Sequence, residues 1–349
     1  MEFGIQFFPD VGPDLIPADQ YWSEALDLTE LCEGLGFTHT RTVEHYFHHY
    51  GGYSANPLLF LASAAQRTKT MRLVTGAILP IFNNPLKIAA EIGEVDALSG
   101  GRLEVGFARA FLPHEFRVFG RSLDESRARF NEGMEQVRRL LEEENVSSDG
   151  EFHSFQNVTS LPRPTQKPRP PFWVATSSSL ETFVAAGQGG HGVMTIPRKP
   201  ELTREWLTTY RQNWKDAGHV GNGRVMYATH MYCAPTTEQA RNEAGPHLEQ
   251  YFKALGEATK DWMEVTSKDY PNHPAMVTEA TTRSIKEMME GNAIWVGSPE
   301  HIIECIETYQ AGVGAIDSAS IQANFHTLSL DQASASLRLF AEHVMPRFI

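Results

Sequence analysis

Short apolar runs alternate with amphipathic stretches along most of the chain. The first run is "FGIQFF" (3–8), and the stretch 19–35 after it repeats apolar side chains every three or four positions, as a buried helix face does. Seven later runs have the length and apolar character of strands, and helical patterns follow them. These runs are 38–45, 71–79, 101–108, 172–177, 191–196, 224–233 and 319–324. The pattern therefore predicts eight strands, each followed by a helix.

Several of the predicted helices begin at recognisable signals. Asn56 and Asn84 each precede a proline, which combines a capping side chain with a residue that is preorganised for the first helical position. Ser329 and Gln332 have the spacing of a capping box, in which each side chain bonds a backbone N–H at the start of the helix. These signals support the helix boundaries that the apolar periodicity predicts.

Two segments interrupt the alternation. Residues 144–171 are polar and then proline-rich, which predicts an excursion of loop and short hairpin, while residues 256–293 lack a clean period and predict a mobile, irregular insertion before the last βα unit. The alternation continues beyond each of them, so neither is a linker between domains. Eight βα units favour a single (β/α)8 TIM barrel over residues 1–349, and a two-domain α/β protein is the alternative.

Composition narrows the possible functions. The formal net charge of −13 argues against nucleic acid and anionic membranes as partners, because both attract Lys and Arg. Cys32, Cys233 and Cys305 are far apart, so we expect reduced thiols rather than a disulfide framework or a thiolate metal site. No apolar stretch approaches the roughly 18 residues of a membrane span, and the N-terminus lacks the pattern of a signal peptide. We expect a cytoplasmic protein.

In such a barrel the reactive groups come from the carboxyl ends of the strands. Arg109 ends an otherwise apolar strand, where an arginine is either a solvated rim charge or an anion clamp. Ser177, Ser178 and Ser179 follow the fifth strand, and Ser178 has the capping-box spacing to Glu181. A capped helix explains one serine. An arginine beside a serine-rich helix N-terminus suits a phosphate group by charge and by hydrogen bonding.

The stretch "VEHYFHHYGGY" (43–53) is rich in histidine and aromatic residues. A zinc or iron site in a barrel needs ligands from several strand ends, whereas these histidines share one loop, so the sequence predicts no metal site. His45 falls at a strand end, which is the place of a catalytic acid or base. His48 and His49 fall in the following loop and are predicted to be rim or packing groups.

Six segments, in this order along the chain, resemble the bacterial luciferase-like flavin monooxygenase family. They are "EHYFHHYGGYSANP", "LVTGAILPIFNNP", "GGRLEVGFARAFLPHEFRVFG", "WVATSSS", "VGSPEHII" and "LRLFAEHVMPRF". The resemblance runs from residue 1 to the end and includes an irregular insertion where luciferase has its mobile active-site loop. It implies the (β/α)8 barrel that the apolar pattern also predicts.

The resemblance implies a two-component FMN-dependent monooxygenase. A separate flavin reductase would supply reduced FMN (FMNH2), which would react with O2 to a C4a-(hydro)peroxide and oxygenate a small organic substrate. His45 would be the acid or base near this peroxide. The Gly76–Ala77 bond would be the family's non-proline cis peptide under the isoalloxazine. The residues assigned to the cofactor are Gly76, Ala77, Arg109, Thr176, Ser177, Ser178 and Ser179.

Two departures from luciferase limit what is carried over. Ala108 stands where luciferase has a reactive cysteine, and Thr176 stands where it has a glutamate, which weakens any expectation of light emission or of a fatty-aldehyde substrate. A deazaflavin (F420)-dependent oxidoreductase and a non-catalytic flavin-binding protein remain alternatives, although the "RVFG" motif after Arg109 favours FMN. Because luciferase-like chains pair through the helices after strands 2 and 3, we expect a homodimer through 57–68, which is apolar on more than one face.

Overall fold

The computed structural model describes residues 1–176, 179–282, 284–291 and 293–349. Within these ranges, eight parallel strands close into a barrel, because β1 pairs with both β2 and β11 and β9 pairs with both β8 and β11. The barrel strands are β1 (Glu2–Phe7), β2 (His39–Thr42), β3 (Arg72–Thr75), β4 (Leu103–Phe107), β7 (Phe172–Ala175), β8 (Gly192–Thr195), β9 (Val225–Cys233) and β11 (Ser318–Gln322). The predicted (β/α)8 barrel and all eight predicted strands are confirmed.

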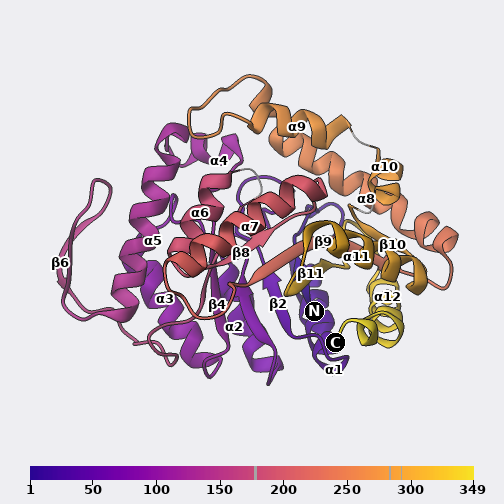
Figure 1. Ribbon diagram of the computed structural model, residues 1–349, viewed down its shortest axis with the longest axis horizontal. Helices are drawn as coiled ribbons and strands as arrows, with labels where there is room; N and C mark the ends of the chain where they lie inside the picture. Colours follow the sequence, from indigo (N-terminus) through magenta and orange to yellow (C-terminus); the bar gives the residue numbers. More distant parts are fainter. Residues whose placement is uncertain (177–178, 283, 292) are drawn as a thin grey trace.

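Helices surround the barrel (Figure 1). They are α1 (Ala18–Gly34), α2 (Pro57–Arg67), α3 (Pro85–Leu98), α4 (Pro113–Val118), α5 (Ser126–Glu142), α6 (Leu180–Gln188), α7 (Pro200–Asp216), α8 (Thr237–Thr259), α9 (His273–Thr282), α10 (Ile285–Glu290), α11 (Pro299–Val313) and α12 (Leu330–His343). Asn56 and Asn84 accept hydrogen bonds from the second helical N–H groups of α2 and α3, and Ser329 and Gln332 form the predicted capping box of α12. The sequence did not predict the short α4 or the strand β10 (Trp295–Gly297), which pairs with the far end of β9.

The two interruptions have different structures. Residues 144–171 contain an antiparallel hairpin of β5 (Val146–Asp149) and β6 (Ser154–Val158), which projects from the edge of the molecule (Figure 1). The segment 256–293 is more helical than an irregular insertion: after the end of α8 it contains a 3₁₀ turn (Lys260–Met263), α9 and α10. Pro, Gly and Asn between these short helices hide their periodicity in the sequence. Its mobility stays a prediction.

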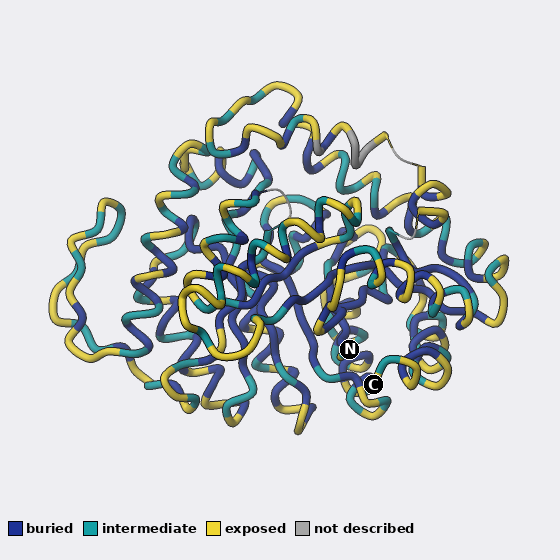
Figure 2. The backbone as a smooth tube through the Cα atoms, in the orientation of Figure 1, coloured by how far each residue is buried: buried dark blue, intermediate teal, exposed yellow. Residues whose placement is uncertain are grey.

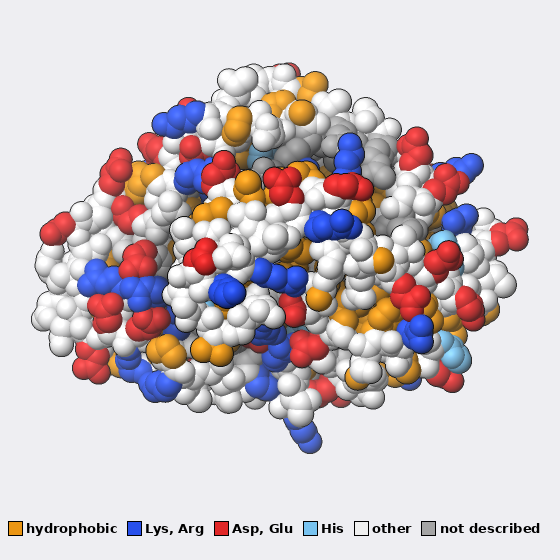
Figure 3. All heavy atoms as spheres, in the orientation of Figure 1, with side chains coloured by type: hydrophobic (Ala, Val, Ile, Leu, Met, Phe, Trp, Pro, Cys, Tyr) orange, Lys and Arg blue, Asp and Glu red, His pale blue; other side chains and the backbone are white. Residues whose placement is uncertain are grey.

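The barrel interior is apolar on one side and polar on the other. Val74, Trp173, Met194 and Met226 form an apolar cluster inside it. The strands are buried, whereas the projecting hairpin is largely exposed (Figure 2). Basic and acidic side chains are interspersed over the visible face (Figure 3). None of the described helices combines the length and apolar character that a membrane span requires.

Candidate active site

His45 lies just beyond the carboxyl end of β2, where the barrel opens. The side chain is buried, and its Nδ1 lies 3.0 Å from Oε1 of Glu115, a fully buried residue of α4. The same carboxylate oxygen accepts the backbone N–H of Tyr46 at 2.8 Å. Because a carboxylate accepts hydrogen bonds, this contact favours the tautomer with the proton on Nδ1 and leaves Nε2 as the basic nitrogen.

Aromatic side chains form the walls around this imidazole. The ring centroids of Phe8, Phe111 and Tyr50 lie 5.2, 5.6 and 6.1 Å from that of His45. Gly51 packs directly behind His45, with a positive φ of 85° and no room for a Cβ, which would lie 2.4 Å from the Cβ of His45. A larger residue at this position would displace the imidazole.

A second buried carboxylate lies next to the first. Glu44 accepts hydrogen bonds from the Tyr46 hydroxyl at 2.6 Å, the Leu79 N–H at 3.0 Å and the Asn83 amide at 2.6 Å. Burial raises the pKa of Glu44 to about 8, although these three hydrogen bonds act in the opposite direction. Glu44 therefore ties the loop after β2 to the loop after β3, which contains the predicted cofactor segment.

The Gly76–Ala77 peptide bond is cis, as the resemblance implied. Ala77 is buried, and the carbonyl of Gly76 accepts a hydrogen bond of 2.8 Å from Nη2 of Arg41 on β2. Gly76 has no side chain for a physical reason, because a Cβ there would lie 1.8 Å from Nε of Arg41. The family resemblance implied the cis bond at Gly76, but nothing in the sequence predicted that Arg41 would bond its carbonyl.

The other histidines of the opening loop lie farther out. His49 is exposed and packs against Gly12, while His48 is half-buried and its Nδ1 accepts the N–H of Tyr50 at 3.0 Å. Burial lowers the pKa of His48, and the neighbouring His114 and His49 lower it further. Among the residues that the structure describes, no three His, Cys, Asp or Glu side chains form a group that could hold a metal ion.

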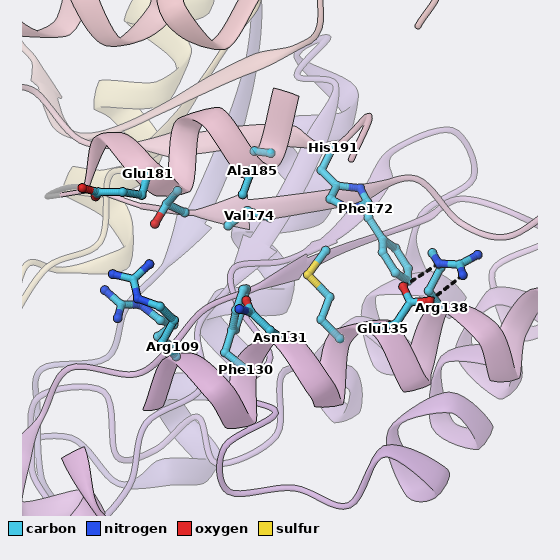
Figure 4. A pocket seen from close by; sticks show the side chains of 14 residues that line it. Arg109, Phe130, Asn131, Glu135, Arg138, Phe172, Val174, Glu181, Ala185 and His191 are labelled. Carbon is cyan, nitrogen blue, oxygen red and sulfur yellow. Dashed lines mark hydrogen bonds and ion pairs between the residues drawn. The ribbon is translucent and has the colours of Figure 1, made fainter. Parts of the chain in front are cut away.

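Arg109 faces a cavity of about 230 Å³ between α5 and α6. Figure 4 shows Arg109 and Glu181 on facing sides of this cavity. Arg127, in the first turn of α5, and Thr182, in the first turn of α6, also line it. Burial lowers the pKa of Arg109, Tyr270 acts in the opposite direction, and the charge of Arg127 lowers it further. Arg109 is half-buried, and Arg138, Glu135 and Glu181 also line the cavity. Three guanidinium groups against two carboxylates favour an anion there.

The serine turn is only partly described. Ser177 and Ser178 lie outside the described residues, so the predicted capping box from Ser178 to Glu181 is not observed. The N-cap of α6 is Ser179, whose hydroxyl donates to the carboxylate of Glu181 at 2.7 Å. Thr176 precedes this turn, and its N–H donates to the carbonyl of Met194 at 2.9 Å. Helix α6 therefore begins beside the arginine cavity, as predicted.

Residues 261–270, here called the strap, cross from the end of α8 to the arginine site. The carbonyl of Asp269 accepts from Nη1 of Arg109 at 3.1 Å, and the Tyr270 ring lies 4.8 Å from the guanidinium carbon. The Tyr270 hydroxyl donates to the carbonyls of Arg109 and Ala110 at 2.9 and 3.0 Å. The strap thus holds both the backbone and the side chain of the arginine that the sequence singled out.

Further contacts fasten the strap on either side. The carboxylate of Asp269 accepts the Ser126 hydroxyl at 3.1 Å and the Arg127 N–H at 2.9 Å, so an acidic side chain caps the N-terminus of α5. The Trp262 indole N–H donates to the carbonyl of Phe111 at 2.8 Å. Phe111 also packs against His45, so the strap is bonded to the segment that runs from the arginine cavity to His45.

Sequence reasoning missed three residues of this region. Glu115 stands in the quoted segment "RAFLPHEFRVFG" but shows no local sign that it meets His45. Arg127 lies in an amphipathic helix that is rich in charged residues, and Arg41 lies in a short strand whose interior face could not be identified as a site. All three assignments need the tertiary structure, because the strands and helices concerned are not neighbours along the chain.

The strap should open more readily when its acidic anchor is removed. Asp269→Ala deletes two hydrogen bonds to a carboxylate, so the free energy of local opening should fall by about 1–3 kcal/mol. Hydrogen exchange followed by mass spectrometry should show faster exchange in residues 261–270. Asp149→Ala, in the distant hairpin, is the control. Unchanged exchange in the strap of the Asp269 variant would show that this anchor does not hold it.

A sequence profile described as "Luciferase-like monooxygenase" matches residues 1–315. The crystal structure of monooxygenase RslO1 from Streptomyces bottropensis superposes with a TM-score of 0.89 at 40% identity over 100% of both chains. The oxygenase component of flavin-dependent trigonelline monooxygenase from Acinetobacter baylyi (strain ATCC 33305 / BD413 / ADP1) is 26% identical over 94% of this chain and 90% of that one.

Two further comparisons are more limited. The FMN complex of the oxygenating constituent of 3,6-diketocamphane monooxygenase from Pseudomonas putida has a TM-score of 0.83 at 18% identity, over 100% of this chain and 99% of that one, which shows a shared fold. The uncharacterized protein y4wF of Sinorhizobium fredii (strain NBRC 101917 / NGR234) is 36% identical, but the match spans 55% of each chain. With the profile covering most of its length, this chain belongs to the luciferase-like monooxygenase family.

Proposed function

We propose that this chain is the oxygenase component of a two-component monooxygenase that uses reduced FMN and O2 to oxygenate a small organic substrate. The observation that carries the proposal is one continuous segment, 109–111, which lines the arginine-rich cavity through Arg109 at one end and packs against the buried His45 through Phe111 at the other. The relatives of this chain include flavin-dependent monooxygenases, and one of them is named as an oxygenase component. A separate reductase would therefore supply the reduced flavin.

The residues of the arginine cavity fit the phosphate of FMN. Arg109 and Arg127 supply two cations, and the N-terminus of α6, with its favourable dipole, lies beside them. Ser177, Ser178, Ser179 and Thr176 would add hydroxyl groups from the turn before α6. Gly76 and Ala77 would lie against the flavin ring. When bound, the reduced flavin supplies the electrons that activate O2.

His45 would hold or move a proton through its Nε2 atom. Glu115 fixes the ring by accepting from Nδ1, and it is itself held by the Tyr46 N–H. The aromatic walls and the strap would keep water from the reacting atoms, which strengthens the electrostatic effect of each polar group. This is the arrangement that a general acid or base requires: a fixed ring, a known tautomer and a dry pocket.

Replacing His45 should separate chemistry from binding. His45→Ala should leave folding and FMNH2 binding nearly intact and lower product formation by about 10²-fold or more, which is the usual contribution of a positioned acid or base. Hydrogen peroxide should rise as product falls, since the flavin still reduces O2. Anaerobic titration followed by single-turnover product analysis measures both effects.

Three variants serve as controls for this experiment. His48→Ala and His49→Ala remove imidazoles of the same loop and should change turnover only a few-fold. Glu115→Gln removes the charge of the carboxylate that orients His45 and should cause an intermediate loss. Equal losses from all three histidine variants, or normal product from His45→Ala, would refute the assignment of His45.

Replacing the arginines should have the opposite effect. Arg109→Ala and Arg127→Ala should each weaken FMNH2 binding by about 1.5–3 kcal/mol, the loss of one charge-assisted contact, while riboflavin, which lacks the phosphate, should bind parent and variants alike. Arg138→Ala is the matched control, because this third arginine of the cavity is already paired with Glu135 and Glu142. Tighter binding of reduced F420 than of FMNH2 to the parent protein would favour the deazaflavin alternative and contradict the FMN assignment.

A homodimer through α2 and α3 is a further part of the proposal. Leu59 on α2 is 71% exposed and Leu98 at the end of α3 is 51% exposed, which leaves apolar surface for a partner copy to cover. The parent protein should sediment as a dimer at micromolar concentration, and Leu59→Asp should shift it toward the monomer. A parent that is monomeric at this concentration would contradict the expectation.

A further inference from the structure

The polar side of the barrel interior contains a buried arginine without an acidic partner. Arg41 is the register partner of Gln6 on β1 and of Val74 on β3. Since Val74 belongs to the interior apolar cluster, Arg41 also points into the barrel. Its guanidinium donates to the side-chain oxygen of Gln6 and to the carbonyl of Gly76, both of which are neutral.

Burying the charge of Arg41 lowers the stability of the fold. Among the described residues, no carboxylate pairs with Arg41, and its Nε has no hydrogen-bond partner. Burial lowers the pKa of Arg41 to about 10, so the group still carries its charge at neutral pH. A buried cation with only neutral partners is retained at the expense of stability, which usually indicates a function.

The arginine keeps a small solvent-accessible surface. Gln6, Arg41 and His230 keep 7, 8 and 9% of their surface, whereas the outward-facing Thr40 and Thr42 on the same strand as Arg41 keep none. His230 and Gln322 are register partners on β9 and β11, and each has a buried atom, Nε2 and Oε1, without a hydrogen-bond partner. Polar atoms without hydrogen-bond partners among the described residues therefore lie here on three strands: β2, β9 and β11.

We propose that Arg41 and Gln6 form an anion-binding subsite toward the carboxyl end of the barrel interior, which takes a planar, negatively charged oxygen group of a bound ligand. Two ligands of the proposed reaction could carry such a group: the reduced flavin, whose pyrimidine ring is anionic after loss of a proton, and an organic substrate that binds as an enolate, phenolate or carboxylate. The inference rests on the proposed function for the first source only.

Gln6→Glu tests the subsite without removing the arginine. The substitution keeps the size of the side chain and gives Arg41 an internal carboxylate, so the protein should be at least as stable as the parent in thermal unfolding. An anion from a ligand should then be repelled. Arg41→Gln removes the charge directly, and Gln239→Glu, on the outer helix α8, adds the same charge elsewhere as the control.

Two binding measurements distinguish the sources. If the flavin supplies the anion, both variants should lower the preference for reduced over oxidised FMN by about tenfold or more in anaerobic titrations, the value of one charge-assisted contact. If the substrate supplies it, this preference stays unchanged, and the variants instead lose binding of benzoate relative to the neutral benzamide. Both probes are measured in an Arg109→Ala, Arg127→Ala background, so that neither arginine of the proposed phosphate site contributes.

The remaining outcomes contradict the proposal. Unchanged affinity ratios for both pairs of probes would show that Arg41 serves only to hold the Gly76 carbonyl. A marked loss of stability in Gln6→Glu would contradict the premise that Arg41 is a charge without an acidic partner. A parent protein that binds no FMN in either oxidation state would refute the proposed function, but the benzoate comparison would still test the subsite.

Discussion

The contact between His45 and Glu115 joins the two halves of the site. His45 follows β2 and Glu115 belongs to α4 after β4, so one hydrogen bond connects loops that are 70 residues apart. Glu115 is fully buried, and a buried carboxylate needs hydrogen-bond donors. The imidazole and the Tyr46 N–H both bond its Oε1, whereas its buried Oε2 has no hydrogen-bond partner among the described residues, so these donors satisfy one of the two oxygens. Glu44 likewise accepts hydrogen bonds from Leu79 and Asn83, and so connects the loop after β3 with the loop after β2.

The arginine cavity depends on a segment that follows it by more than 140 residues. Arg109 and the start of α5 are held by Asp269 and Tyr270 of the strap, and Trp262 bonds the carbonyl of Phe111 beside the histidine pocket. A movement of the strap would therefore alter the contacts of Arg109 and of Phe111 together. In the proposed reaction, phosphate binding and the exclusion of water from His45 would be coupled through these shared contacts.

The strands, and the site residues at their ends, could be predicted from the sequence because both follow local rules. Period and length mark the eight strands, and barrel geometry then brings His45, Gly76 and Arg109 to one end. Glu115 and Arg127 could not be assigned, since their roles arise from contacts between elements that the sequence does not pair. The helices within 256–293 were missed because short helices between Pro and Gly residues leave no repeat long enough to detect.

The two sides of the barrel interior differ in their side chains, because one is apolar and the other contains the buried Arg41. Val74, Trp173, Met194 and Met226 fill one side with apolar side chains, and at the amino-terminal end Glu104 neutralises Arg72 and Arg224 at 3.3 and 3.2 Å. Every charge in that lower layer has an opposite partner. Arg41 lies closer to the carboxyl end of the barrel and has no acidic partner among the described residues. Arg72, nearer the amino-terminal end, does have one. The unpaired arginine lies toward the end where His45 and Arg109 gather, and not at the end that only stabilises the fold.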